Sequence, residues 1–125
     1  MTGTTGSINS TQVIFGAVGQ YFSPANLASF QAWANSPVIP AVALIGGHVN
    51  DTKCYVHSNC AEANMDMQYI MTMSPYSPTT YWYSDSWFTS FIAAVLDTAK
   101  PPKVISISYG TSEVGMPAEI GRAHV

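Results

Sequence analysis

The chain has 125 residues, 47% of them hydrophobic and 9% charged, and its formal net charge at pH 7 is −3. This length allows one domain at most, and the hydrophobic fraction is that of a folded protein. Its four basic residues are too few for a nucleic-acid surface, so we expect no nucleic acid as a partner. No apolar run approaches the ~20 residues that cross a bilayer, so we expect no membrane partner.

The hydrophobic pattern predicts strands and helices in alternation. In chain order we expect a strand at 12–15, a helix at 25–33, a strand at 38–45, a helix at 60–73, a strand at 79–83, a helix at 87–99 and a strand at 104–109. Ser23 and Pro24 suit the start of the first helix, and Ser58 or Asn59 would cap the second.

This order of elements predicts an α/β fold with a mostly parallel sheet and flanking helices. The run at 38–45 is continuously apolar apart from Pro40, as in a strand that is buried on both faces. In such sheets functional sites gather beyond the carboxyl ends of the strands, here near Gly46-Gly47 and Tyr109-Gly110.

Several features indicate a secreted or lumenal protein. Asn9 and Asn50 each begin an acceptor pattern for N-glycosylation, and the low charge suits a protein that works in acid. The residues after Met1 do not resemble a signal peptide, so the native start is expected upstream if the protein is secreted. Residues 120–125 match a translated sequencing adapter, and we expect this tail to carry no function.

Cys54 and Cys60 flank a short segment, and we expect them to form a disulfide. A metal site is the alternative, because Cys54, His57 and Cys60 have a usable spacing. A closed zinc site needs four ligands, and the fourth would be His48 or Asp51. The motifs of nucleotide-binding proteins and of zinc proteases with an H-E-x-x-H sequence do not occur.

Glu62 and Asp66 stand four residues apart on the second predicted helix, so their side chains share a face. Neither Lys nor Arg occurs between Cys54 and Ala99, so no nearby residue in the sequence neutralises the pair. Such a pair is expected to titrate as a dyad and to hold one proton tightly. The alternative is an ordinary solvated helix face.

An aromatic group follows in the next strand and helix. It would serve either as a platform for a ligand or, as we expect, as part of the core. Its members are Tyr76, Tyr81, Trp82, Tyr83, Trp87 and Phe88.

Three segments, in order and spacing, resemble the sedolisin family of serine-carboxyl peptidases, nearest its tripeptidyl-peptidase branch. They are Gln20-Tyr21-Phe22-Ser23-Pro24-Ala25-Asn26-Leu27, Glu62-Ala63-Asn64-Met65-Asp66-Met67-Gln68-Tyr69-Ile70 and Ile105-Ser106-Ile107-Ser108-Tyr109-Gly110. The most specific is the Glu-Ala-x-x-Asp-x-Gln-Tyr-Ile segment, and the resemblance extends from about Ser10 to Glu113.

The resemblance implies a subtilisin-like α/β domain with a Ser-Glu-Asp triad that cleaves peptide or protein substrates. Glu62 would be the general base and Asp66 its partner, whereas Ser108, Tyr109 and Gly110 would bind the substrate backbone. A Glu base still accepts a proton in acid, where a His base would already be protonated. The implied location is extracellular or a lysosome-like acidic compartment.

The chain also departs from the family pattern. The oxyanion Asp and the nucleophilic Ser are expected further along the family's sequence, and Ser112 stands too close to the Ser-Tyr-Gly segment to be that nucleophile. The family's calcium ion is bound by its distal C-terminal part, so no ligand is assigned here. We therefore expect residues 1–119 to be the N-terminal part of a truncated catalytic domain, inactive alone. A non-catalytic secreted α/β binding module is the alternative.

Overall fold

The structure is a computed structural model that describes residues 6–110 and 112. All strand pairs in its four-stranded sheet are parallel, and the strand order is β2-β3-β1-β4. The predicted α/β class and the alternation of strands and helices are confirmed. The elements are β1 (Gln12–Gly16), α1 (Pro24–Trp33), β2 (Ala43–Ile45), the short 3₁₀ helices η1 (Thr52–Tyr55) and η2 (His57–Asn59), α2 (Ala61–Met73), β3 (Thr79–Tyr83), α3 (Trp87–Leu96) and β4 (Val104–Ser106).

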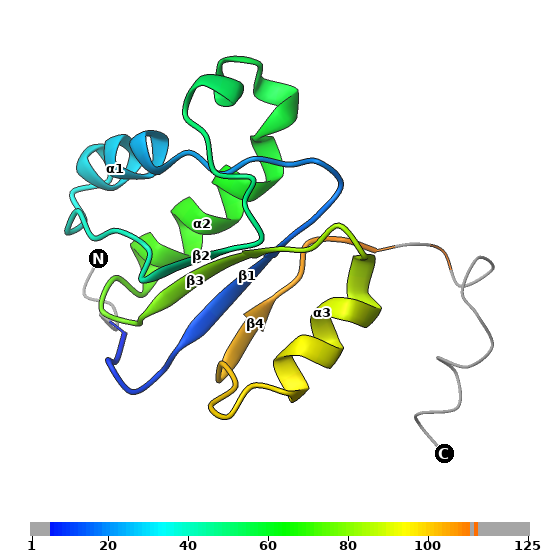
Figure 1. The fold of residues 1–125 in the computed structure, drawn as a ribbon. Coiled ribbons are helices and arrows are strands. Elements are labelled where there is room, and N and C mark those ends of the chain that lie inside the picture. Colours follow the sequence, from blue (N-terminus) through cyan, green and yellow to red (C-terminus); the bar gives the residue numbers. More distant parts are fainter. Residues whose placement is uncertain (1–5, 111, 113–125) are drawn as a thin grey trace.

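Helices cover both faces of the sheet, with α1 and α2 on one side and α3 on the other (Figure 1). All five residues of β1 are buried, because this strand lies between β3 and β4 and is covered on both faces. Its side chains alternate between two hydrophobic clusters. Ile14 packs with Met67 of α2, and Phe15 packs with Phe91 of α3. These clusters fix α2 against the sheet.

The first helix begins as the sequence predicts. The Ser23 side chain accepts a hydrogen bond from the backbone N–H of Asn26, and Pro24 occupies the first helical turn. The prediction of a Ser58 or Asn59 cap on α2 is wrong. Its N-cap is Cys60, which makes no side-chain cap bond, because residues 57–59 are already coiled into η2.

The prediction of a doubly buried strand at 38–45 is also wrong. Only Ala43–Ile45 is strand, and it lies at an edge of the sheet, where 47% of Leu44 is exposed. The preceding residues lie against α1 instead, since the buried Gln31 side chain accepts from the Ile39 N–H and donates to the Ile39 carbonyl. Pro40, which has no N–H, cannot extend the ladder.

Two other elements are shorter than predicted. α3 ends at Leu96 rather than Ala99, and Thr98 folds back so that its hydroxyl donates to the Ala94 carbonyl. β4 ends at Ser106 rather than Tyr109, since only its three residues pair with β1. In the segment beyond β4, the Ser108 side chain reaches α2, whereas Tyr109 packs against the cluster on the α3 side of the sheet.

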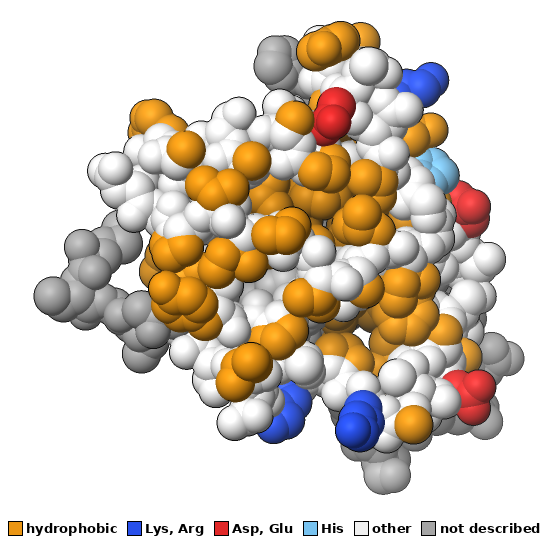
Figure 2. Space-filling view, turned by 60° about the vertical axis from the view of Figure 1, so that its left-hand side comes forward, with side chains coloured by type: hydrophobic (Ala, Val, Ile, Leu, Met, Phe, Trp, Pro, Cys, Tyr) orange, Lys and Arg blue, Asp and Glu red, His pale blue; other side chains and the backbone are white. Residues whose placement is uncertain are grey.

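The surface on the side of α1 and β2 carries many hydrophobic side chains and few charged ones (Figure 2). Val38, Val42, Leu44 and Ile45 are among its exposed hydrophobic residues. No helix in the described part of the chain is both long and apolar enough to cross a membrane. The expected tail at 120–125 lies outside the described residues.

Candidate active site

Glu62 and Asp66 lie on the same side of α2. Ala63, Met67 and Met71 form the buried stripe of this helix, which faces the sheet. Glu62 and Asp66 each immediately precede a member of the stripe, and both are half-buried. Residues four apart on a helix have Cβ atoms about 5–6 Å apart. The two side chains therefore share one face of α2, at the border between the core and the surface.

The two oxygens of the Asp66 carboxyl group have different surroundings. Oδ1 accepts a hydrogen bond of 2.8 Å from the Ser108 hydroxyl. Oδ2 is buried and has no hydrogen-bond partner among the described residues. Burial raises the pKa of Asp66 above its ordinary value, and the hydrogen bond from Ser108 opposes this shift in part. Asp66 therefore retains its proton at a higher pH than an ordinary Asp.

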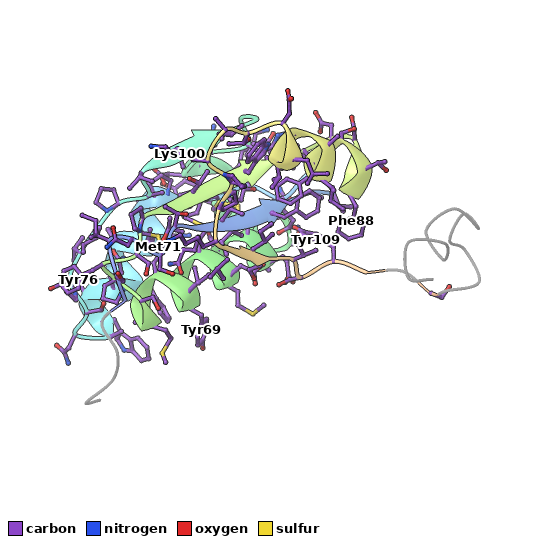
Figure 3. All side chains as sticks on the ribbon, turned by 90° about the horizontal axis from the view of Figure 1, so that it is seen from below. Tyr69, Met71, Tyr76, Phe88, Lys100 and Tyr109 are labelled. Atoms are coloured by element: carbon purple, nitrogen blue, oxygen red, sulfur yellow. A yellow bond between two sulfur atoms is a disulfide. The ribbon has the colours of Figure 1, made fainter. Side chains whose placement is uncertain are left out.

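Tyr109, the residue after Ser108, packs against the cluster on the α3 side of the sheet. Its ring meets Phe15 edge to face at 5.6 Å between centroids, and its hydroxyl donates to the Ala17 carbonyl at 3.4 Å. Burial raises the pKa of Tyr109, and the charges of Glu62 and Asp66 raise it further. Figure 3 shows Tyr109 beyond the end of β4, close to the sheet. The pair thus lies near the carboxyl ends of β1 and β4.

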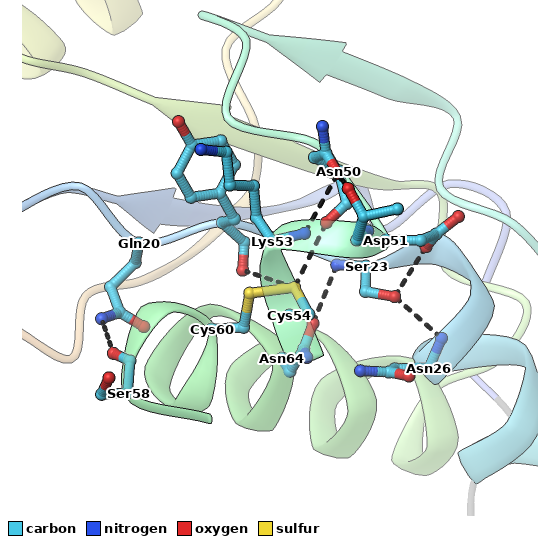
Figure 4. Close-up of a disulfide and its surroundings, with 12 residues drawn as sticks. Gln20, Ser23, Asn26, Asn50, Asp51, Lys53, Cys54, Ser58, Cys60 and Asn64 are labelled. Atoms are coloured by element: carbon cyan, nitrogen blue, oxygen red, sulfur yellow. Dashed lines mark hydrogen bonds between the residues drawn. A yellow bond between two sulfur atoms is a disulfide. The ribbon is translucent and has the colours of Figure 1, made fainter. Parts of the chain in front are cut away.

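Gln20 holds the start of α2, which the capping residue leaves without a side-chain bond. Its Nε2 donates to the Ser58 carbonyl at 2.8 Å (Figure 4). Its Oε1 accepts from the backbone N–H of Glu62 at 3.2 Å. The Gln20 carbonyl accepts from the buried Tyr81 hydroxyl. The backbone of Glu62 is thereby connected to the loop after β1 and to β3.

A shallow hydrophobic groove runs beside the carboxyl pair. Figure 3 shows that Tyr69 projects from α2 away from the sheet, whereas Met71 points toward it. The groove follows this outer side of α2 and reaches β4. Its lining residues are Met65, Asp66, Tyr69, Ile70, Met73 and Ser106.

Cys54 and Cys60 are joined by a disulfide with 5.3 Å between their Cα atoms. The bridge ties η1 to the first residue before α2 (Figure 4). Its sulfurs are therefore not available as metal ligands, and the side chain of His57 lies outside the described residues. Among the described residues no three His, Cys, Asp or Glu side chains form a group that could hold a metal.

Most of the aromatic group belongs to the core, as expected. Tyr81 and Tyr83 are buried, and Trp82 and Phe88 pack against the cluster on the α3 side. Tyr76 is 52% exposed.

The structure brings four of the five expected site residues together and leaves one at their margin. Ser108 donates a hydrogen bond to Asp66, and the charges of Glu62 and Asp66 act on Tyr109, whereas Gly110 is exposed. Ser112, which was not expected to be a site residue, is exposed as well. Sequence reasoning missed the role of the Ser108 side chain and that of Gln20. Gln20 opens one of the family-like segments, and this was the only signal for it.

The chain matches no protein-family model, no curated protein and no solved structure. Its function is therefore argued from the site itself.

Proposed function

We propose that this chain is the N-terminal part of the catalytic domain of an acid-acting serine-type peptidase of the sedolisin kind. Glu62 is the general base of its Ser-Glu-Asp triad, and Asp66 is the partner of that base. The observation that carries the proposal is the hydrogen bond from Ser108 to Asp66. It joins two of the family-like segments at the carboxyl edge of the parallel sheet, where active sites of such folds lie.

The burial of the pair supports catalysis in acid. A general base works best when its pKa is near the operating pH, and a carboxylate meets this condition where an imidazole does not. Because burial raises the pKa of Asp66, this residue keeps its proton and uses it to donate a hydrogen bond to Glu62, which stays an unprotonated carboxylate. Glu62 then accepts the proton of the attacking serine, and Asp66 orients it, as the third member of a triad does.

The nucleophilic serine and the oxyanion Asp belong to a further part of the proposed protein. Until they are present, the pair has no hydroxyl to activate. We therefore propose that the 125-residue chain alone is inactive, and that the complete domain has the subtilisin-like arrangement.

Residues 108–110 are the proposed binding segment for the substrate backbone. They continue from β4, an edge strand whose outer side pairs with no strand of the described chain. Such an edge offers N–H and C=O groups to an extended peptide. Gly110 adds no side chain that would obstruct it. The proposed substrates are peptides or proteins, cleaved by tripeptidyl-peptidase or endopeptidase action.

The proposed location is extracellular or a lysosome-like acidic compartment. A disulfide is stable in an oxidising compartment, and both asparagines of the glycosylation patterns, Asn9 and Asn50, are exposed. The side-chain oxygen Oδ1 of Asn50 accepts from the Thr52 and Lys53 N–H groups, so a sugar on the side-chain nitrogen would leave this turn intact.

Determining the sequence of the complete transcript tests the proposal. A Gly-Asp segment and a Gly-Thr-Ser motif are expected downstream of Glu113 in the native reading frame. A stop codon shortly after Glu113 in the native transcript would contradict the peptidase and favour the binding module.

A further inference from the structure

The Ser108 hydroxyl joins the segment after β4 directly to the carboxyl pair on α2. Its Oγ lies 2.8 Å from Asp66 Oδ1 and donates a hydrogen bond to it. Asp66 Oδ2 has no such partner among the described residues, although it is buried. One oxygen of the carboxyl group is therefore occupied, and the other is available.

A buried oxygen without a hydrogen bond is costly, and such atoms are rare in folded proteins. Glu62 precedes Asp66 by one turn on the same face of α2, and the charges of both carboxyl groups raise the pKa of Tyr109 in the segment after β4. The Tyr109 hydroxyl already donates to the Ala17 carbonyl. Within the described part of the chain, neither Lys nor Arg is among the groups that perturb Asp66. Because Glu62 lies one turn earlier on the same face of α2, we take it as the partner of Oδ2.

We propose that Ser108 is a positioning residue that holds Asp66 Oδ1 and thereby directs Oδ2 toward the proton shared with Glu62. This inference rests on the proposed function and adds a role for the Ser108 side chain to the substrate contacts of its backbone. In acid, Oδ2 carries a proton and donates a hydrogen bond to the Glu62 carboxylate. The pair neither gains nor loses a proton when this hydrogen bond forms.

The hydrogen bond from Ser108 is the contact that fixes the Asp66 carboxyl group, which explains why Ser108 would matter. Without the hydroxyl, the carboxyl group can rotate about its terminal bond, which has a broad energy minimum. Its two oxygens then become equivalent, and the hydrogen bond to Glu62 loses its fixed geometry. Because the same segment is the proposed substrate strand, the orientation of Asp66 is coupled to the place where the peptide binds.

Carboxyl titration by NMR tests the inference in the 125-residue chain. The pair is expected to titrate in two steps that belong to both groups together. Ser108→Ala weakens the shared hydrogen bond. It is therefore expected to raise the pH of the lower titration step of the pair by about half a unit. Ser29→Ala is the control, since the Ser29 hydroxyl donates to the Ala25 carbonyl on α1 and does not contact Asp66.

A second pair of variants separates the hydroxyl from the shape of the side chain. Ser108→Thr keeps a hydroxyl and is expected to leave the lower step in place, whereas the similarly shaped Ser108→Val is expected to raise it. The inference is overturned if Ser108→Ala and Ser108→Val leave the step unchanged in folded protein. An equal shift in Ser29→Ala also overturns it.

Activity of the complete protein distinguishes this inference from the proposed function. There Ser108→Ala is expected to lower kcat more than it changes KM and to move the acid limb of the pH profile upward, and Ser108→Thr restores both. If substitution of Ser108 leaves the lower pKa of the pair unchanged while Glu62→Ala abolishes activity, the positioning role is wrong and the peptidase function is supported. If the Glu62→Ala variant remains active, the proposed peptidase mechanism is wrong, whatever the result of the titration.

Discussion

The Gln20 side chain and the backbone N–H of Glu62 are joined by a hydrogen bond of 3.2 Å across 42 residues of sequence. This contact replaces the missing side-chain cap of α2 and fixes the residue that we propose as the general base. A second bond, from Gln20 to the Ser58 carbonyl, holds the turn before the helix. The loop after β1 therefore determines where α2 begins.

Gln20→Ala is expected to lower the free energy of unfolding by about 1 kcal/mol, because it leaves the Glu62 N–H and the Ser58 carbonyl without these partners. Hydrogen exchange at the Glu62 amide should accelerate as well. Urea unfolding and amide exchange measure both effects. Gln68→Ala is the control, since Gln68 makes only a long, exposed hydrogen bond of 3.5 Å to Asn26. Equal losses in the two variants would contradict the capping role.

Reducing the Cys54–Cys60 disulfide is expected to lower the free energy of unfolding by about 2 kcal/mol, as loop-closure entropy predicts for so short a loop. Urea unfolding of the oxidised and the reduced chain measures the difference. Reductant should have no effect on a Cys54→Ala/Cys60→Ala variant. Free thiols in the denatured, unreduced chain would show that the bridge is absent.

Met67→Ala is expected to cost about 2–5 kcal/mol, because Met67 is fully buried between α2 and the sheet. Met65→Ala on the same helix is the matched control. Met65 is 46% exposed, and a change of at most about 0.5 kcal/mol is expected there. Similar costs for the two variants in urea unfolding would mean that a different face of α2 packs on the sheet.

Asp66 and Asp51 are expected to give opposite dependences of stability on pH. The pKa of Asp66 is raised by burial, so its contribution to stability is fully present below the unfolded pKa of about 3.9 and is lost as the pH rises through the folded pKa. The pKa of Asp51 is lowered by hydrogen bonds from Ser23 and the Ala25 N–H. Its contribution is present above about pH 3.9 and is lost as the pH falls.

Unfolding of Asp66→Asn and Asp51→Asn at a series of pH values measures this contrast. As the pH rises from about 4, Asp66→Asn should gain stability relative to wild type. As the pH rises through the acid range, Asp51→Asn should lose stability relative to wild type. Parallel curves for the two variants would contradict the assigned surroundings of both residues.

Local patterns predicted the strongly periodic elements of the fold well. The Ser23-Pro24 start of α1 and the strand at 79–83 depend on neighbouring residues, and both were confirmed. The run at 38–45 failed because hydrophobicity does not show which strand lies at the sheet edge, or that Gln31 binds Ile39. In the candidate site, the spacing of Glu62 and Asp66 predicted their shared face. The Ser108 contact depends on tertiary structure and had no local signal.

The pH profile of peptide hydrolysis by the complete protein, measured with and without Glu62→Ala, tests the central claim most directly. We predict an acidic optimum and a decrease in kcat of about 10³-fold or more in the variant, because removing the general base of a triad has an effect of at least this size. Full activity in Glu62→Ala, or a neutral optimum with loss below about pH 6 as a His base would give, would contradict the account.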